Sequence, residues 1–107
     1  MIAVLFEADA VPEMQDRYFQ LAAELRPLLA EINGFISIER FQSLNTPGKI
    51  LSLSWWQDEE SVAQWKKNAC HQSAQQEGRE SIFSFYRIRV AEVIREYSSE
   101  SVRLHHV

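Results

Sequence analysis

The chain has 107 residues, of which 46% are hydrophobic and 24% charged, and this balance fits one globular domain and excludes intrinsic disorder. Its formal net charge is -4, and Lys and Arg are scattered among Asp and Glu. The sequence therefore offers no basic stripe for binding nucleic acid, and we do not expect nucleic acid as a partner.

The N-terminal segment predicts a strand. Residues 1–8 are rich in β-branched and large apolar side chains, and Pro12 follows shortly after them. The segment has no basic start and reaches Glu7 too early for a signal peptide or a membrane span. The single cysteine, Cys70, cannot form an intramolecular disulfide. We therefore expect a cytoplasmic protein that does not enter a membrane.

The next stretch predicts an amphipathic helix. Apolar residues recur at steps of three and four positions between Met14 and Ile32, which places them on one helical face. Asn33 and Gly34 follow, and glycine takes the left-handed conformation that ends many helices. The helix should therefore end at this pair.

Two extended runs come next, at residues 35–43 and 49–57. Pro47 and Gly48 lie between them, and this pair favours a type II turn. The sequence therefore predicts a β-hairpin.

A second helix should follow the hairpin. Asp58 can cap it, and Val62, Trp65 and Ala69 form its apolar stripe. Residues 70–79 are polar and rich in Gln, so we expect a further helical turn or two with an irregular end.

The last regular element should be a strand over residues 82–97. Apolar and polar residues alternate there, with Tyr86 and Ile88 on one side and Arg87 on the other. We take residues 1–97 as the domain and residues 98–107 as a polar C-terminal tail that is mobile unless it docks on a partner.

The predicted order of elements is βαββαβ, the pattern of a ferredoxin-like α+β fold with an antiparallel sheet. Two helices can cover one face of this sheet, yet both faces carry large apolar side chains. These are Leu51, Leu53 and Trp55 on one face, and Trp56 and Phe41 on the other. A second copy related by a two-fold axis would cover the free face, so we expect a homodimer that forms a dimeric α+β barrel; the alternative is a monomer with an apolar sheet surface.

Three segments resemble the antibiotic biosynthesis monooxygenase (ABM) family of dimeric α+β barrel proteins. They are the Asn33-Gly34-Phe35 turn, the run from Ser54 to Glu59, and Trp65 followed by His71. The resemblance covers residues 1–97 and implies the same fold. The family includes oxygenases that use no metal or flavin, enzymes that bind and degrade haem, and many members whose role is unassigned.

The resemblance also implies where a site would lie. The cofactor-free oxygenases of the family carry an Asn and a Trp one turn apart on the second helix; Trp65 matches the Trp, whereas Ser61 stands in place of the Asn. The haem-degrading members carry an Asn on the first strand and a His ten residues after this Trp, but the first strand here has no Asn and the tenth residue is Gln75. A haem-binding role is therefore the less favoured branch.

Each candidate residue also has a structural interpretation. Trp65 lies on an apolar stripe, where aromatic residues usually belong to the core. His71 titrates near neutral pH and could act as the base for a phenolic substrate, although a helix-end or surface histidine is the common case. Arg40 could orient an anionic ligand or belong to an ion pair, and Arg87, Arg89 and Glu39 fall in the same class.

Two further residue types predict no site. Cys70 has no close basic neighbour in sequence, and we expect a small, partly buried side chain rather than a nucleophile. His105 and His106 lack a third ligand at metal-site spacing, so no metal is expected. No phosphate-binding glycine loop occurs either, so no cofactor is expected.

The sequence leaves two functions open. In the first, the protein is a cofactor-independent monooxygenase that acts on a small hydroxylated aromatic, quinol-like substrate. His71 and Trp65 are then the expected catalytic residues, and the expected substrate-binding residues are Trp65, Ser61, Trp56, Arg40 and Tyr86. In the second, it is a non-catalytic or stress-related module of the same fold that binds a small molecule.

Overall fold

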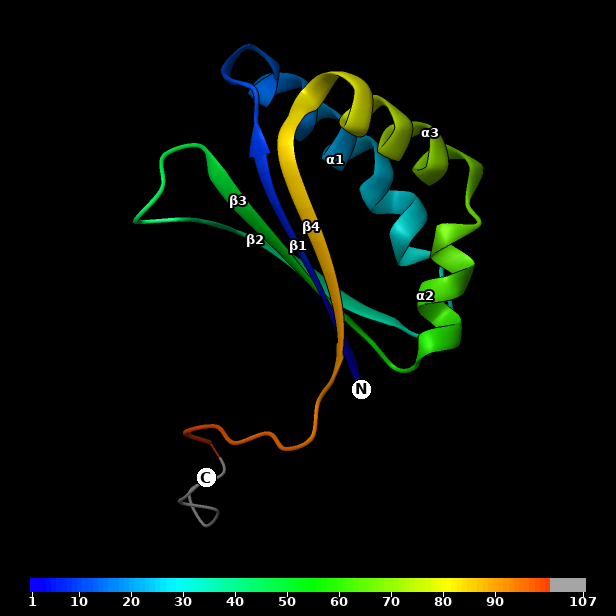
Figure 1. The fold of residues 1–107 in the computed structure, drawn as a ribbon. Coiled ribbons are helices and arrows are strands. Elements are labelled where there is room, and N and C mark those ends of the chain that lie inside the picture. The colour runs from blue at the N-terminus through cyan, green and yellow to red at the C-terminus, as the bar shows by residue number, and fades with distance from the viewer. Residues whose placement is uncertain (101–107) are drawn as a thin grey trace.

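The computed structural model of the protein describes residues 1–100 and consists of one antiparallel sheet with helices packed on it (Figure 1). The strands are β1 (Ile2–Ala10), β2 (Phe35–Gln42), β3 (Lys49–Trp56) and β4 (Phe83–Glu92). The helices are the 3₁₀ turn η1 (Pro12–Met14), α1 (Gln15–Ala30), α2 (Glu59–Lys66), α3 (Ala69–Glu77) and the π-helical turn η2 (Gly78–Ile82). The prediction of an α+β fold is confirmed.

The strand order is β2-β3-β1-β4, and every neighbouring pair is antiparallel. This is the ferredoxin-like arrangement that the element order predicts. Figure 1 shows α1, α2 and α3 on the same side of the sheet. No helix of the described residues therefore covers the other side.

The helix-covered face of the sheet is defined by the strand register. Ile2, Val4 and Phe6 of β1 alternate with residues that point to the other face, and they pair with Trp56, Ser54 and Ser52 of β3. A first buried cluster lies at one end of this face, and its members are Ile2, Leu29, Trp56, Val62 and Trp65. A second buried cluster lies toward the other end, and its members are Ala10, Tyr18 and Ile82.

The uncovered face carries a mixture of apolar and charged side chains. Leu5 pairs with Leu53 there, and Glu7 forms an ion pair with Lys49 at 3.1 Å. Phe41 pairs with Leu51, so both lie on this face. The prediction that Phe41 shares a face with Trp56 is wrong, because the register shifts between Phe35 and Ser37 and changes which residues of β2 face the helices.

Two predicted boundaries also differ from the structure. β4 ends at Glu92 and not at residue 97; Glu92 pairs with Ile2, the first residue of β1, and Val93 N–H donates to the Met1 carbonyl at 3.0 Å just beyond the strand. Ala69 does not continue α2, because Asn68 interrupts the helix and caps α3. The predicted helical turns after residue 70 are confirmed as α3 and η2.

The hairpin turn is confirmed: Gly48 has φ +82°, and Lys49 N–H donates to the Thr46 carbonyl at 3.3 Å. Gly34 has the expected left-handed conformation, with φ +97°, but the helix ends before the predicted stop. α1 ends at Ala30, because the N–H groups of Glu31 and Ile32 donate to the Leu28 and Leu29 carbonyls in a tighter turn. Cys70 is exposed, so the expectation of a partly buried side chain is wrong. His105, His106 and the end of the predicted tail lie outside the described residues.

Candidate active site

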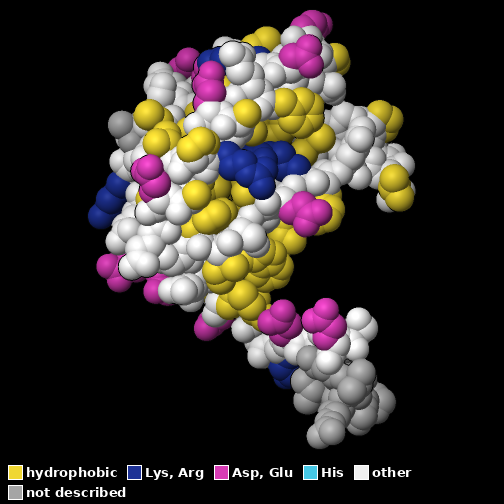
Figure 2. Space-filling model, turned by 180° about the vertical axis from the view of Figure 1, so that it is seen from behind, with side chains coloured by type: hydrophobic (Ala, Val, Ile, Leu, Met, Phe, Trp, Pro, Cys, Tyr) yellow, Lys and Arg dark blue, Asp and Glu magenta, His cyan; other side chains and the backbone are white. Residues whose placement is uncertain are grey.

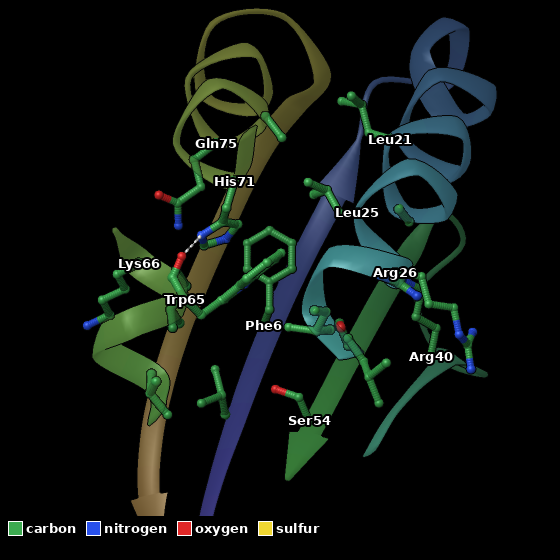
Figure 3. Close-up of a pocket in the computed structure, with 18 of the residues that line it drawn as sticks. Phe6, Leu21, Leu25, Arg26, Arg40, Ser54, Trp65, Lys66, His71 and Gln75 are labelled. Carbon is green, nitrogen blue, oxygen red and sulfur yellow. Dashed lines mark hydrogen bonds between the residues drawn. The ribbon is translucent and has the colours of Figure 1, made fainter. Parts of the chain in front are cut away.

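A cavity of about 190 Å³ lies between the helices and the covered face of the sheet. Most of its lining is apolar and includes Phe6 from β1 and Leu21 and Leu25 from α1 (Figure 3). A mostly apolar pocket with a few polar groups is the usual form of a small-molecule site.

Trp65 forms part of the wall of this cavity and is only 9% exposed. The start of its helix is fixed by Asp58, whose Oδ1 accepts hydrogen bonds from the Ser61 N–H at 2.9 Å and from the Ser61 hydroxyl at 2.8 Å. These bonds hold the pKa of Asp58 below its ordinary value, so the cap stays ionised.

The same helix is held against the sheet by a close contact at Gly34. A Cβ atom on Gly34 would lie 1.9 Å from Ser61 Oγ, a distance that only a glycine permits. Gln57 N–H also donates to the Gly34 carbonyl at 2.8 Å. The turn after α1 therefore fixes where α2 begins, and Trp65 follows one turn later.

His71 is placed over Trp65 by the cap of α3. Asn68 Oδ1 accepts from the His71 N–H at 3.0 Å, and the two rings stack with centroids 4.5 Å apart and planes at 24°. His71 Nδ1 lies 3.2 Å from the Trp65 carbonyl oxygen, which can only accept a hydrogen bond (Figure 3). Nδ1 therefore carries the proton in the neutral ring, and Nε2 carries the lone pair.

The protonation state of His71 follows from its surroundings. Burial lowers the pKa of His71 below its ordinary value, and the hydrogen bond to the Trp65 carbonyl opposes this in part. Within residues 1–100, Nε2 has no hydrogen-bond partner. His71 is thus neutral near pH 7 and has a free basic nitrogen on a residue that lines the cavity.

Arginines occupy the opposite side of the cavity from His71. Figure 3 shows Arg26 of α1 and Arg40 of β2 together across the cavity from the Trp65–His71 stack. Arg40 Nε donates to the Tyr18 hydroxyl at 3.3 Å, and its guanidinium lies 5.9 Å from the centroid of the Tyr18 ring. The side of the cavity opposite His71 therefore carries two guanidinium groups.

The floor of the cavity on the sheet carries two serines. Ser54 Oγ accepts from Trp56 Nε1 at 2.9 Å, which satisfies the buried indole. Ser52 is 7% exposed, and its hydroxyl forms no hydrogen bond with the described part of the chain. Ser52 can therefore bond to a ligand, whereas Ser54 already holds Trp56.

The structure brings together four of the residues predicted for the site: Trp56, Trp65, His71 and Arg40 all line the cavity. Ser61 and Tyr86 do not line it; Ser61 is used in the contact with Asp58 and Gly34. Arg87 and Arg89 pair with residues of the uncovered face and lie on the other side of the sheet.

Sequence reasoning did not single out Arg26 or Tyr18 for the site. Tyr18 falls within the apolar pattern predicted for residues 14–32, and only the tertiary fold reveals that its hydroxyl accepts a hydrogen bond from Arg40. The Asn68 cap was also missed, although an Asn three residues before His71 is a helix-start signal.

Residues 1–100 contain no group of three or more His, Cys, Asp or Glu side chains placed to hold a metal ion. Within the same residues, every helix is too short or too polar to cross a membrane.

The sequence model of the family described as antibiotic biosynthesis monooxygenase matches residues 1–77. A protein of Pyricularia oryzae named jasmonate monooxygenase ABM is 44% identical over 103 residues, which are 96% of this chain and 48% of that protein. The chain thus spans about half the length of this relative. The uncharacterized protein YqjZ of Bacillus subtilis is 28% identical over 94 residues, which are 88% of this chain and 80% of that protein.

Solved structures agree on the fold. A putative antibiotic biosynthesis monooxygenase from Deinococcus radiodurans superposes with a TM-score of 0.81 at 14% identity, covering 92% of this chain and 97% of that one. Rv0793 from Mycobacterium tuberculosis gives a TM-score of 0.79 at 12% identity, covering 91% and 98%. At such identities the likeness concerns the fold alone.

Proposed function

The chain belongs to the antibiotic biosynthesis monooxygenase family, and from this premise we propose that it is a cofactor-independent monooxygenase of small hydroxylated aromatic, quinol-like molecules. The observation that carries the proposal is a neutral His71 with a free Nε2, stacked on Trp65 at the wall of an apolar cavity. A base and an aromatic wall in a dry pocket are what such chemistry needs.

The first step is the removal of a proton from the substrate. A phenolic or benzylic proton passes to His71 Nε2, while Nδ1–H continues to donate to the Trp65 carbonyl, which stabilises the imidazolium that forms. The pKa of His71 is lowered by burial, so the base is not already protonated at neutral pH. The products of this step are an electron-rich substrate anion and a protonated His71.

Molecular oxygen then supplies the oxidant as a second substrate. The anion transfers an electron to O₂ and recombines with it to form a carbon–oxygen bond. The resulting peroxide anion takes the proton back from His71, and the hydroperoxide so formed loses water, which leaves a carbonyl. One oxygen atom ends in the product and the other in water, so oxidation of an activated CH₂ to C=O supplies all four electrons. The protein contributes orientation, desolvation and the proton carrier.

Trp65 sets the plane of the bound ring. Its indole is held on one side by the stacked His71 and sits in the buried cluster with Trp56 and Val62, so it is a rigid wall. A planar substrate can pack against apolar wall residues such as Phe6, and Ser52 offers a free hydroxyl on the sheet. These contacts support a planar substrate over a branched one.

The name of the Pyricularia oryzae relative favours a second substrate candidate, jasmonate, which is a small cyclopentanone acid. Hydroxylation of an unactivated carbon by O₂ consumes two electrons more than the C–H bond supplies, so this activity would require an external reductant. The jasmonate candidate is therefore distinguished by its need for an added electron donor.

The non-catalytic alternative is favoured by one observation. The cofactor-free oxygenases of the family share an Asn at the position that Ser61 occupies in this chain. Ser61 does not line the cavity; its hydroxyl donates to Asp58, and its side chain packs against Gly34. In that case the cavity would bind a small molecule without turning it over.

A homodimer is part of the same proposal. The uncovered sheet face contains Leu51, Leu53 and Trp55, and Phe41 and Phe85 on it are 43% and 39% exposed. Monomers rarely leave such a face open, and a second copy is its simplest cover. Light scattering at micromolar concentration should give about twice the chain mass of 12.5 kDa, and a mass of one chain would contradict the dimer.

Oxygen uptake tests the activity. A panel of quinols and anthrones, and jasmonate with and without an added electron donor, should be assayed with purified protein and with heat-denatured protein as the background. At least one hydroxylated aromatic should consume O₂ faster than the background. Uptake equal to background for every compound would support the binding module instead.

A further inference from the structure

The charges that line the cavity are of one sign. The chain has 15 acidic and 11 basic residues, yet among residues 1–100 no Asp or Glu lines the cavity, whereas Arg26, Arg40 and Lys66 do. Figure 3 shows Lys66 extending away from the interior, while Arg26 and Arg40 lie together at the side opposite His71. The cationic end of the cavity thus consists of two arginines.

Neither arginine is neutralised by an acidic side chain of the described residues. The ion pairs among residues 1–100 are Arg17–Glu77 and Lys49–Glu7, and neither includes Arg26 or Arg40. Arg40 is partly buried and uses Nε on the Tyr18 hydroxyl, which leaves its two terminal nitrogens free. Figure 2 shows basic side chains sunk in a hollow that hydrophobic side chains surround, on the face opposite to the view of Figure 1.

We propose that Arg26 and Arg40 form a binding site for the carboxylate of an organic acid whose apolar body fills the cavity. This inference rests on the proposed function and names the substrate class more narrowly, as a carboxylate-bearing molecule. The planar forks of two guanidiniums match the two oxygens of a carboxylate. Tyr18 adds a donor, because its oxygen accepts from Arg40 and its own proton remains available.

The lining favours a carboxylate over a phosphate. Apart from the arginines, the groups near this end are the hydroxyls of Tyr18 and of Ser52, which pairs with Arg40 across the sheet, and apolar residues of α1 such as Leu25 and Ala22. A monoanion on a mostly apolar molecule is balanced by two arginines without a further cation.

The site also fixes the direction in which a ligand binds. With its carboxylate on Arg26 and Arg40, the ligand extends across the cavity toward Trp65 and His71 (Figure 3). The reacting carbon is then presented to Nε2, at the end away from the charge. Arg26 and Arg40 are therefore positioning residues that set both affinity and orientation.

The test is isothermal titration calorimetry with naphthalene-1-acetate and its neutral analogue, naphthalene-1-acetamide. Wild-type protein should bind the acid at least about tenfold more tightly than the amide, since hydrogen bonds to charged groups discriminate by at least this much. Arg40→Gln and Arg26→Gln should each weaken acid binding and leave amide binding unchanged. Arg26 is exposed, so its variant keeps the fold even if Arg40→Gln disturbs the contact with Tyr18.

Arg79→Gln is the matched control, because Arg79 is an exposed arginine that does not line the cavity, and it should keep the full preference for the acid. Equal affinity for acid and amide in the wild type, binding of neither compound, or a preference that persists in both Arg26→Gln and Arg40→Gln would overturn the proposal. The readout is binding and not turnover, so an acid preference stands even if no oxygen uptake is found, and the proposed function can fail separately.

Discussion

Replacing Gly34 with Ala should destabilise the protein through two separate effects. Gly34 has φ +97°, and forcing an alanine into this left-handed region costs roughly 1–2 kcal/mol. The new Cβ would also lie 1.9 Å from Ser61 Oγ and 2.9 Å from Ser61 Cβ, so α2 must shift, and overpacking of this kind costs a further ~1–3 kcal/mol. The expected loss in the free energy of unfolding is therefore about 2–5 kcal/mol.

Gly48→Ala separates the two effects. Gly48 has φ +82°, but the nearest atom to its added Cβ is Gln15 Nε2 at 3.6 Å, an ordinary contact. Gly48→Ala should therefore show the backbone cost alone, about 1–2 kcal/mol, and Gly34→Ala should exceed it. Urea unfolding at one pH measures both variants.

Ser61→Gly tests the contact directly. In this background the atoms that crowd the new Cβ are gone, so Gly34→Ala should cost about as much as Gly48→Ala, and the double-mutant cycle should show coupling. The reasoning is refuted if Gly34→Ala costs no more than Gly48→Ala in the wild-type background, or if Ser61→Gly leaves its cost unchanged.

Two further predictions concern the stack on the cavity wall. The pKa of His71 is lowered in the folded protein, so the unfolded chain binds more protons as pH falls through the ordinary histidine pKa of about 6.5. The free energy of unfolding should therefore fall as pH decreases from about 7.5 to 5.5. Urea titrations should show a smaller decrease for His71→Gln, which lacks the titrating group. An identical pH dependence in the two proteins would contradict the burial of a neutral His71. Trp65→Phe should keep the fold, because it removes less volume than a truncation of this buried side chain to Ala, which costs about 3–5 kcal/mol. Calorimetry should show that the variant binds ligand about two- to tenfold more weakly, because stacking area is lost. Unchanged affinity would mean that the ligand does not pack on Trp65.

Much of the fold could be predicted because local signals and the global pattern agree. The steps of three and four in residues 14–32, the Pro47-Gly48 turn and the Asp58 cap each specify one element, and the βαββαβ order leaves one economical sheet. The errors in the strands arose where the pairing of neighbouring strands decides which face a residue lies on and where a strand ends. Phe41 lies on the other face because of a register shift in β2, and β4 ends opposite Ile2, the first residue of β1.

The site was only partly predictable for a related reason. Trp65 and His71 could each be singled out from local sequence, but the Asn68 cap that brings their rings together was not recognised there. Arg26 and Arg40 come from different elements and meet only after α1 packs on the sheet. No periodicity or motif in the sequence encodes that meeting, which is why Arg40 alone was proposed and Arg26 was not.

The most direct test of the proposed function is the rate of product formation under ¹⁸O₂, measured by mass spectrometry for wild-type protein and for His71→Gln with the most active hydroxylated aromatic of the panel. The expected product carries one ¹⁸O atom, and the variant should be slower by roughly a hundred- to ten-thousandfold, the contribution of a positioned general base. A product without the label, or a His71→Gln variant as fast as the wild type, would contradict the assignment of this cavity as a monooxygenase site.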